Sequence, residues 1–515
     1  MRSRFVLTHC LILIAASLAM STTPPSPRLA GLFASSPSSS SASIGSAALA
    51  PSAAVGNLLQ GYNTGVIAAA LLSIVPEFGL AQRPAVVGLI ASSTTLGAFS
   101  GTIASGPLCD RAGRRSTLML SSALFLLGGA LMAWSPTVEV LLVGRLVGGV
   151  AAGLVSTAVP TYLAECAPAA WRGAMSTLPQ LCVSSGILLS YLVGLAAMLG
   201  SADWRFMLGI SMLPALMQAA CVLRLPESPR WLLGKRGDSD AARRALQQLR
   251  GSDDVETELA ALSKGLEREA AAVAGSEETG FRKLLSVPAL RRTLLVCATL
   301  QMFQQMCGVN AIVYFTPQIL REAGAPQLLA QVRPGWSADT AAMAATTLAY
   351  LPKIPSVLLA TYLIDRSGRR ALLTTAVPVM TACLGALAAC LGLGGTVPAA
   401  GAVATTAVML YGVFFGMSLG PMPNIIASEL FPTHARSAGV ALSTGVQWIF
   451  NALVAAAFPL LVKQLGTSGV LYGFALVCVA AWLFVLRFVP ETRGVPLEEL
   501  GRLMEREGDA KPKVE

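Results

Sequence analysis

Apolar residues occur along this chain in long runs, which short polar or Gly/Pro-rich segments interrupt. After residue 50, runs of about 20 residues, the length that crosses a bilayer as a helix, occur about twelve times. The pattern predicts a polytopic helical bundle. In the first half we expect spans at 54–75, 85–107, 116–134, 138–163, 174–198 and 205–225. In the second half we expect them at 291–318, 340–364, 371–392, 399–427, 437–462 and 468–489.

Composition supports a membrane protein and argues against a soluble enzyme. Of the 515 residues, 54% are hydrophobic and only 12% are charged, and the mean hydropathy is +0.64. The net charge of +10 arises from Lys and Arg in alternate connecting loops, at 110–115, 230–292 and 367–370. Basic residues on one side of the spans indicate cytoplasmic loops, which also places both ends of the bundle in the cytoplasm. The charge therefore reports topology and predicts no nucleic-acid partner.

Cysteine and histidine usage predicts neither a metal nor a cofactor. The ten cysteines are scattered singly without a CxxC motif, and we interpret them as small packed thiols. The two histidines, His9 and His434, lie far apart in the sequence.

The first 50 residues have the composition of a targeting leader. "MRSRFVLTHCLILIAASLAMS" has two arginines, a short apolar core and small residues, as a cleavable signal peptide does. A Ser/Ala-rich tract follows, and no acidic residue occurs before Glu77, which is typical of transit peptides. We expect a two-part leader to a plastid bounded by extra membranes; a disordered tail is the alternative.

Three motifs recur in the same order in the two halves. "DRAGRR" at Asp110 returns as "DRSGRR" 255 residues later, and the Glu165–Arg172 motif ExxPxxxR returns 264 residues later. "PES" at Pro226 returns as "PET", again 264 residues later. This repeat predicts two parallel six-helix halves, a transporter plan in which the substrate site lies between the halves.

The predicted fold class is thus an all-α membrane protein with twelve transmembrane helices. The expected organisation is a leader at 1–50, a six-helix half at 51–230, a cytoplasmic helical linker at 231–288, a second half at 289–490 and a cytoplasmic tail at 491–515. The linker is assigned because its polar sequence has helical spacing and high helix propensity.

The repeated charged residues are candidates for a cytoplasmic gate, because Asp, Glu and Arg at neighbouring helix ends can pair and hold that side shut. The alternative is that the arginines only fix the orientation, since surface ion pairs contribute about 0–1 kcal/mol each. The gate residues are Asp110, Arg111, Arg114, Glu165, Arg172, Glu227, Arg230, Asp365, Arg369, Glu429, Arg436 and Glu491.

Beyond residue 55 the chain resembles the sugar porter family of the major facilitator superfamily. The resemblance rests on nine motifs in family order: "GYNTGV", "GPLCDRAGRR", "GRLVGGVAAG", "PTYLAECAPAAWRG", "PESPRWLL", "QQMCGVNAIVYF", "DRSGRR", "GPMPNIIASELFP" and "PETRG". It implies a bundle that exposes a central polar site to each side of the membrane in turn. The substrate would be a monosaccharide, with a hexose as first candidate.

The resemblance also implies the residues that bind the sugar. A sugar has many hydroxyls and no charge, so amides that donate and accept, together with aromatic faces, suit it. The alternative for each amide is a hydrogen bond between helices. The implied residues are Gln180, Gln304, Gln305, Asn310, Tyr314, Gln447, Trp448 and Asn451.

Two residues depart from the family pattern. Asn424 stands where the family usually has Trp, and it adds an amide to the expected substrate site. Lys353 lies about 18 Å of helix from Asp365 and hence near the middle of the bilayer, where a Lys is expensive and by default functional. Lys353 either donates to substrate hydroxyls, stays neutral in a dry pocket or extends into a water-filled cavity.

The resemblance also bears on energy coupling. Proton-coupled relatives usually carry Asp in the GYxTG motif, opposite an Arg of the fourth span that Arg145 matches. Asn63 replaces this acid, so we expect a facilitative uniporter; a symporter coupled through Lys353 and a non-transporting sensor are alternatives. The particular sugar or polyol, the oligomeric state and the membrane stay open, the membrane among plasma membrane, plastid envelope and vacuole.

Overall fold

The structure is a computed structural model that describes residues 44–168, 172–200, 202–274, 284, 286–327, 335–392, 399–431 and 435–492. All regular elements in these ranges are helices, which confirms the predicted all-α class. Residues 1–43 of the predicted leader and all of the predicted tail beyond residue 492 lie outside the described residues.

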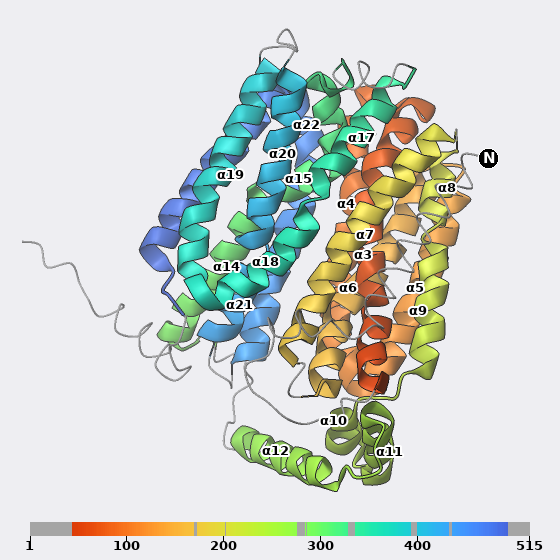
Figure 1. Cartoon of the computed structure of the whole chain (residues 1–515), viewed down its shortest axis with the longest axis vertical. Coiled ribbons are helices and arrows are strands. Elements are labelled where there is room, and N and C mark those ends of the chain that lie inside the picture. Colours follow the sequence, from red (N-terminus) through yellow and green to blue (C-terminus); the bar gives the residue numbers. More distant parts are fainter. Residues whose placement is uncertain are drawn as a thin grey trace, which may run out of the picture. The chain divides into compact units, whose positions relative to one another are not determined.

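The chain divides into two compact units. Unit 1 consists of Met1–Val66 and Gly97–Ala272, and unit 2 consists of Ile67–Leu96 and Val273–Glu515, so α3 and α4 contribute to both. The membrane helices of the first half are α3 (Ile44–Glu77), α4 (Pro84–Ala112), α5 (Arg114–Ala133), α6 (Val138–Cys166), α7 (Arg172–Leu199), α8 (Trp204–Gly209) and α9 (Met212–Arg224) (Figure 1). Those of the second half are α14 (Pro288–Met306), α15 (Val309–Glu322), α17 (Ala338–Tyr350), α18 (Lys353–Ser367), α19 (Arg369–Gly392), α20 (Ala400–Met417), α21 (Met422–Leu430) and α22 (Arg436–Phe488).

The described helices account for the twelve predicted crossings. Ten helical stretches are long and apolar enough to cross a membrane, and one of them, Ala438–Phe488, is 51 residues long. This stretch contains Gly466 with φ 72° and ψ 161°, so it forms two crossings joined at a turn. The twelfth crossing is the pair α14 and α15, which is interrupted at Gly308. All twelve predicted spans overlap observed helices.

Glycines bring α3 and α7 unusually close together within unit 1. A Cβ on Gly61 would collide with the carbonyl oxygen of Val183, and a Cβ on Gly186 would collide with that of Leu58. Gly65, one turn after Gly61, lies against Ile187 and Ser190 of α7. The two glycines of the GYNTG motif therefore serve close helix packing, as small residues do in membrane helices.

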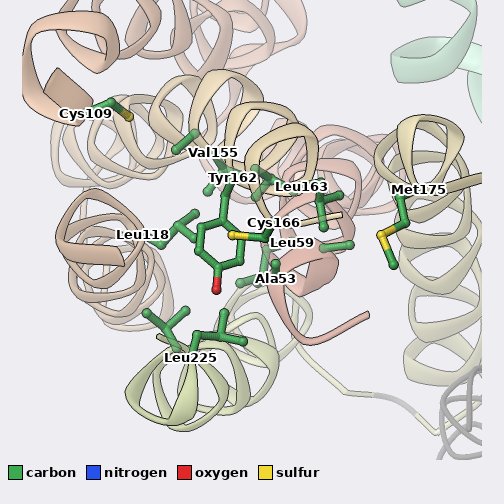
Figure 2. Close-up of a cluster of buried hydrophobic side chains, with 14 of the residues drawn as sticks. Ala53, Leu59, Cys109, Leu118, Val155, Tyr162, Leu163, Cys166, Met175 and Leu225 are labelled. Atoms are coloured by element: carbon green, nitrogen blue, oxygen red, sulfur yellow. The ribbon is translucent and has the colours of Figure 1, made fainter. Parts of the chain in front are cut away.

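The core of unit 1 contains a buried tyrosine at the end of α6. Tyr162 is 1% exposed and packs among Leu59, Leu118 and Leu225 (Figure 2). Its hydroxyl donates a hydrogen bond of 2.9 Å to the carbonyl oxygen of Pro226. A buried tyrosine hydroxyl requires such a partner, so this contact fixes the segment that follows α9.

The described part of the linker consists of short helical segments joined by turns. It comprises α10 (Pro229–Trp231), η3 (Leu232–Arg236), α11 (Ser239–Arg250) and α12 (Glu256–Ala274). The side chain of Asp238 caps α11 by accepting a hydrogen bond from the backbone N–H of Ala241. Arg250 pairs with Glu258 of α12 at 2.6 Å and donates to the carbonyl oxygen of Cys166 at 2.9 Å. These contacts attach the linker helices to the end of α6.

Candidate functional site

Three of the predicted sugar-binding amides form a continuous hydrogen-bonded chain in unit 2. Asn310 Nδ2 donates to Gln305 Oε1, and Gln305 Nε2 donates to Gln304 Oε1 at 3.1 Å. The chain depends on the break between α14 and α15, where Gly308 has a φ of +87°. In an unbroken helix, residues five apart lie about 140° apart around the axis, so Asn310 would point away from Gln305.

The amide chain ends on a second helix break. Gln304 Nε2 donates to the carbonyl oxygens of Leu419 and Gly420, at 2.8 and 2.6 Å. These residues lie between the end of α20 at Met417 and the start of α21 at Met422. A helix end leaves carbonyl groups without intrahelical partners, and Gln304 supplies donors to two of them.

Gln301 also belongs to this cluster, although it is not among the predicted sugar-binding residues. It lies one turn before Gln304 on α14, is fully buried, and donates from Nε2 to Oδ1 of Asn424 at 2.7 Å. Its spacing of three residues from Gln304, on the same helix face, is the signal that would have identified it. The structure thus connects Asn424, the residue that departs from the family pattern, to α14.

Two unpartnered polar atoms lie one turn apart on α22. Trp448 Nε1 and Asn451 Oδ1 are buried and make no hydrogen bond to the described residues. Gln447, next to Trp448, is half-buried. Both groups lie on the first of the two crossings of α22, before the turn at Gly466.

Tyr314 is nearly fully buried, and its hydroxyl lies 3.5 Å from Thr95 Oγ1 on α4. Both residues belong to unit 2. The structure therefore places Tyr314 in a hydrogen-bonding contact with α4.

Lys353, 7% exposed, is the first residue of α18. Its Nζ lies 4.9 Å from the centre of the Tyr350 ring and 5.5 Å from the centre of the Phe415 ring. A Cβ on Gly416 would lie 2.9 Å from Ser356 Oγ but at an ordinary contact distance of 3.8 Å from Lys353 Cγ, so this glycine makes room for Ser356. Among the described residues Lys353 has no acidic partner within salt-bridge distance, so the two aromatic faces are the contacts that compensate its charge.

In unit 1 the predicted coupling residues Asn63 and Arg145 are both buried, with exposures of 4% and 1%. Asn63 Nδ2 donates to the carbonyl oxygen of Leu59 in its own helix at 3.1 Å. Two residues along a helix correspond to about 200°, so Asn63 lies on the face of α3 opposite Gly61 and Gly65, and thus away from α7.

Gln180, the remaining predicted sugar ligand, lies on α7 in unit 1 and is exposed. No hydrogen bond joins it to the other described residues of that unit. Its amide is therefore available to a ligand.

The repeated charged motifs form the same set of contacts in each unit. In unit 1, Arg114 on α5 pairs with Glu165 on α6 at 2.8 Å. Glu227 accepts hydrogen bonds from the backbone N–H groups of Arg114 and Arg115 at the start of α5, at 2.9 and 3.1 Å. A carboxylate at a helix N-terminus is favourable because it meets both free donors and the helix dipole.

Unit 2 repeats these contacts with the second set of motifs. Arg369 pairs with Glu429 at 2.8 Å, and Glu491 accepts from the backbone N–H groups of Arg369 and Arg370, at 2.9 and 3.1 Å. Thr492 donates to Glu429 as well. The motifs that recur in the sequence thus make the same ion pair and the same backbone hydrogen bonds in each unit.

The other predicted gate residues vary in their placement. Asp110 is exposed and lies 3.6 Å from Arg114, and Arg111 is also exposed. Arg230 is half-buried in α10. Arg436 donates from Nε to the carbonyl oxygen of Phe431 at 3.2 Å, and its Nη2 is buried without a partner among the described residues. The side chains of Arg172 and Asp365, and the whole of His434, lie outside the described residues.

A family model described as "Sugar (and other) transporter" matches residues 49–504. The chain belongs to this family. The match confirms the predicted membership and agrees with the prediction that the chain is not an enzyme. The chain is therefore a multi-pass integral membrane transporter.

Relatives of this sugar transporter family member are named for several substrates. Glucose transporter GlcP of Staphylococcus epidermidis is 35% identical, with 88% of this chain and 96% of the relative covered. Galactose-proton symporter of Escherichia coli is 34% identical, with 87% and 92% covered. Probable inositol transporter 2 of Arabidopsis thaliana is 32% identical, with 89% and 91% covered.

A solved transporter structure has the same fold as this sugar transporter family member. The xylose transporter XylE from E. coli, in a partially occluded inward open conformation, matches with a TM-score of 0.72 and 25% identity. The match covers 87% of this chain and 98% of that chain. XylE is described as a major facilitator superfamily proton:xylose symporter. The predicted major facilitator fold, twelve helices in two six-helix halves, is thereby confirmed.

Proposed function

We propose that this chain carries a monosaccharide, with a hexose as first candidate, across its membrane by alternating access as a facilitative uniporter. The observation that carries the substrate class is the set of unmet polar atoms in unit 2. Gln301 Oε1, Trp448 Nε1 and Asn451 Oδ1 are buried without partners among the described residues. Each such atom costs about 1–3 kcal/mol, which a polyhydroxylated ligand would recover by donating and accepting hydrogen bonds.

The amide chain of Gln304, Gln305 and Asn310 supports the same substrate class. It offers neutral groups that both donate and accept, and it contains no charged member. The names of three relatives specify glucose, galactose and inositol, and all three are neutral polyhydroxylated molecules. We propose Gln180, Tyr314, Asn424 and Gln447 as further ligands.

Asn63 supports uniport over symport. An amide does not exchange a proton near neutral pH, and the Nδ2 group of Asn63 is engaged by a carbonyl of its own helix. Protonation therefore cannot change the charge at position 63.

A proton-coupled symporter is the second candidate, and Lys353 is the observation that favours it. Lys353 is a buried ionisable group without an acidic partner among the described residues. Intramembrane ionisable residues commonly form part of ion pathways. The relative named as a galactose-proton symporter shows that such coupling occurs in this family.

Uptake measurements on purified protein in liposomes test both proposals. Radiolabelled glucose uptake, competed with hexoses, pentoses, cyclitols and linear polyols, identifies the substrate class. A pH jump with equal sugar on both sides then tests coupling: uniport predicts no net accumulation, and accumulation would establish symport. A complete lack of flux for all sugars and polyols would instead favour a sensor.

The membrane of residence is a separate proposal. The leader at 1–50 supports a plastid envelope over the plasma membrane or vacuole. A fluorescent fusion to the full chain tests this, with a fusion that begins at residue 51 as the control. Identical distributions of the two fusions would contradict a targeting role for the leader.

A further inference from the structure

Gln301 and Asn424 form an amide pair between α14 and α21. Gln301 Nε2 donates to Asn424 Oδ1 at 2.7 Å. Gln301 is fully buried, whereas Asn424 is exposed in the first turn of α21. One member of the pair is therefore enclosed by protein and the other is accessible to a ligand.

The direction of this hydrogen bond determines what Asn424 offers to a ligand. A side-chain amide has a carbonyl end that accepts and an NH₂ end that donates. Gln301 fixes the carbonyl end of Asn424 by taking one of its two acceptor positions, whereas both N–H donors of the NH₂ end make no hydrogen bond to the described residues. Asn424 is thus oriented as a donor.

The pair is poorly explained as an attachment between helices. Gln304, one turn further along α14, already holds the α20–α21 junction through two hydrogen bonds to the carbonyl groups of Leu419 and Gly420. Gln301 instead leaves its own Oε1 buried without a partner among the described residues. An apolar residue would avoid that cost and fill the same space.

We propose that Gln301 is a positioning residue that holds the Asn424 side chain with its N–H donors toward the substrate. This subsite then recognises one substrate hydroxyl through its oxygen, as an acceptor. The inference rests on the proposed function, because it assigns a polarity to one contact with a neutral polyhydroxylated substrate.

Deoxy and deoxyfluoro analogues of the best transported sugar test this polarity. A C–F group accepts a weak hydrogen bond and cannot donate one, whereas a C–H group does neither. We measure the inhibition constant of each singly substituted analogue against uptake in liposomes. In the wild type, one ring position should retain inhibition with fluorine and lose about 3- to 10-fold with hydrogen, the value of one hydrogen bond.

Variants then assign that position to the amide pair. Gln301→Leu should remove the fluorine-over-hydrogen preference, and Asn424→Leu should remove it to the same extent. The double variant should lose no more of the fluorine-over-hydrogen preference than either single variant, because the two residues act as one unit. Asn424 is exposed, so Asn424→Leu keeps the test valid if Gln301→Leu does not fold.

Gln218→Leu is a matched control. Gln218 is also fully buried, donates from Nε2 to Ser121 Oγ at 3.0 Å and leaves its Oε1 without a partner. The same substitution there should change stability in the same direction and leave the analogue preference intact.

The possible outcomes separate this inference from the proposed function. An unchanged preference in Gln301→Leu, or a wild-type site that prefers hydroxyl over fluorine at every position, would overturn the inference alone. A wild-type protein that neither binds nor carries any sugar or polyol would overturn the proposed function and this inference with it.

Discussion

Replacing Gly61 by alanine should destabilise the protein, because α3 and α7 touch through their backbones at this point. The added Cβ would collide with the carbonyl oxygen of Val183, a backbone atom that cannot rotate away. The helices must then separate, which also loosens the neighbouring contact between Gly186 and Leu58. Overpacking of this kind costs about 1–3 kcal/mol, and we expect the upper part of this range.

Two further glycines make this prediction quantitative. A Cβ on Gly65 would meet the Oγ atom of Ser190, which can rotate at the expense of its hydrogen bond to Ile187. Gly65→Ala should therefore cost less, about 1 kcal/mol. Gly385 on α19 has open space around its Cβ position, and Gly385→Ala should stabilise the helix by about 0.5–1 kcal/mol.

Thermal unfolding in detergent, followed with a thiol-reactive dye, measures the order of these variants. The dye reports unfolding because cysteines in both halves, such as Cys166 and Cys297, are buried in the folded protein. The midpoints should rise in the order Gly61→Ala, Gly65→Ala, wild type, Gly385→Ala. A Gly61→Ala midpoint at or above that of the wild type would refute the reasoning that these glycines set the helix separation.

Three other variants test the charged and polar residues. Glu491→Gln should lower the unfolding midpoint by the equivalent of about 1–3 kcal/mol, because it loses a charged acceptor at the start of α19. Glu227→Gln should have the same effect at the start of α5. Faster transport at an unchanged midpoint would instead support a gate. Asn63→Asp should make uptake depend on pH if Arg145 is its partner, whereas flux that is insensitive to pH in the variant would contradict this. Lys353→Met should keep or raise the unfolding midpoint, because it removes a buried ionisable group without an acidic partner. The same variant should raise the KM for substrate, and an unchanged KM would exclude Lys353 from the substrate site.

The sequence predicted the helices and the repeat because both depend on local properties. A sufficiently long run of apolar residues predicts a transmembrane helix on its own, and the polar segments on either side indicate where that helix ends. The pairing of Arg114 with Glu165, and its counterpart in the second half, followed from recurrence of the same motifs at the same helix ends. Even the interrupted helix at Gly308 lies within a predicted span, although the interruption itself was not predicted.

Hydrogen-bond partners were less predictable, because many of them are backbone groups. Almost every residue has the same backbone N–H and C=O groups, so the sequence does not show which of them will accept or donate. Glu227 and Glu491 were predicted only as members of a charged gate, and both accept hydrogen bonds from the first N–H groups of a helix. Gln304 likewise binds backbone carbonyl groups as well as another amide. These contacts depend on where helices begin and end in space, which the hydrophobic pattern gives only to within a few residues.

The polar residues inside the spans separate into two kinds once their partners are known. Thr64 donates to the carbonyl oxygen of Gln60 in its own helix at 2.8 Å, and Asn63 makes the same kind of bond. The hydrogen-bonding groups of such side chains are satisfied within their own helix and therefore give no indication of a ligand. Trp448 and Asn451 are different, because each leaves a buried atom unmet one turn from the other.

An unmet atom alone does not identify a ligand site, since Gln218 has one as well. What distinguishes Gln301 is its partner: it donates to the exposed Asn424, whereas Gln218 donates to the fully buried Ser121. A ligand can reach an exposed amide that a buried one holds in place, whereas the enclosed pair of Gln218 and Ser121 offers it no group. The comparison of Gln301→Leu with Gln218→Leu therefore asks whether contact with an exposed amide, and not burial of an amide, marks the substrate site.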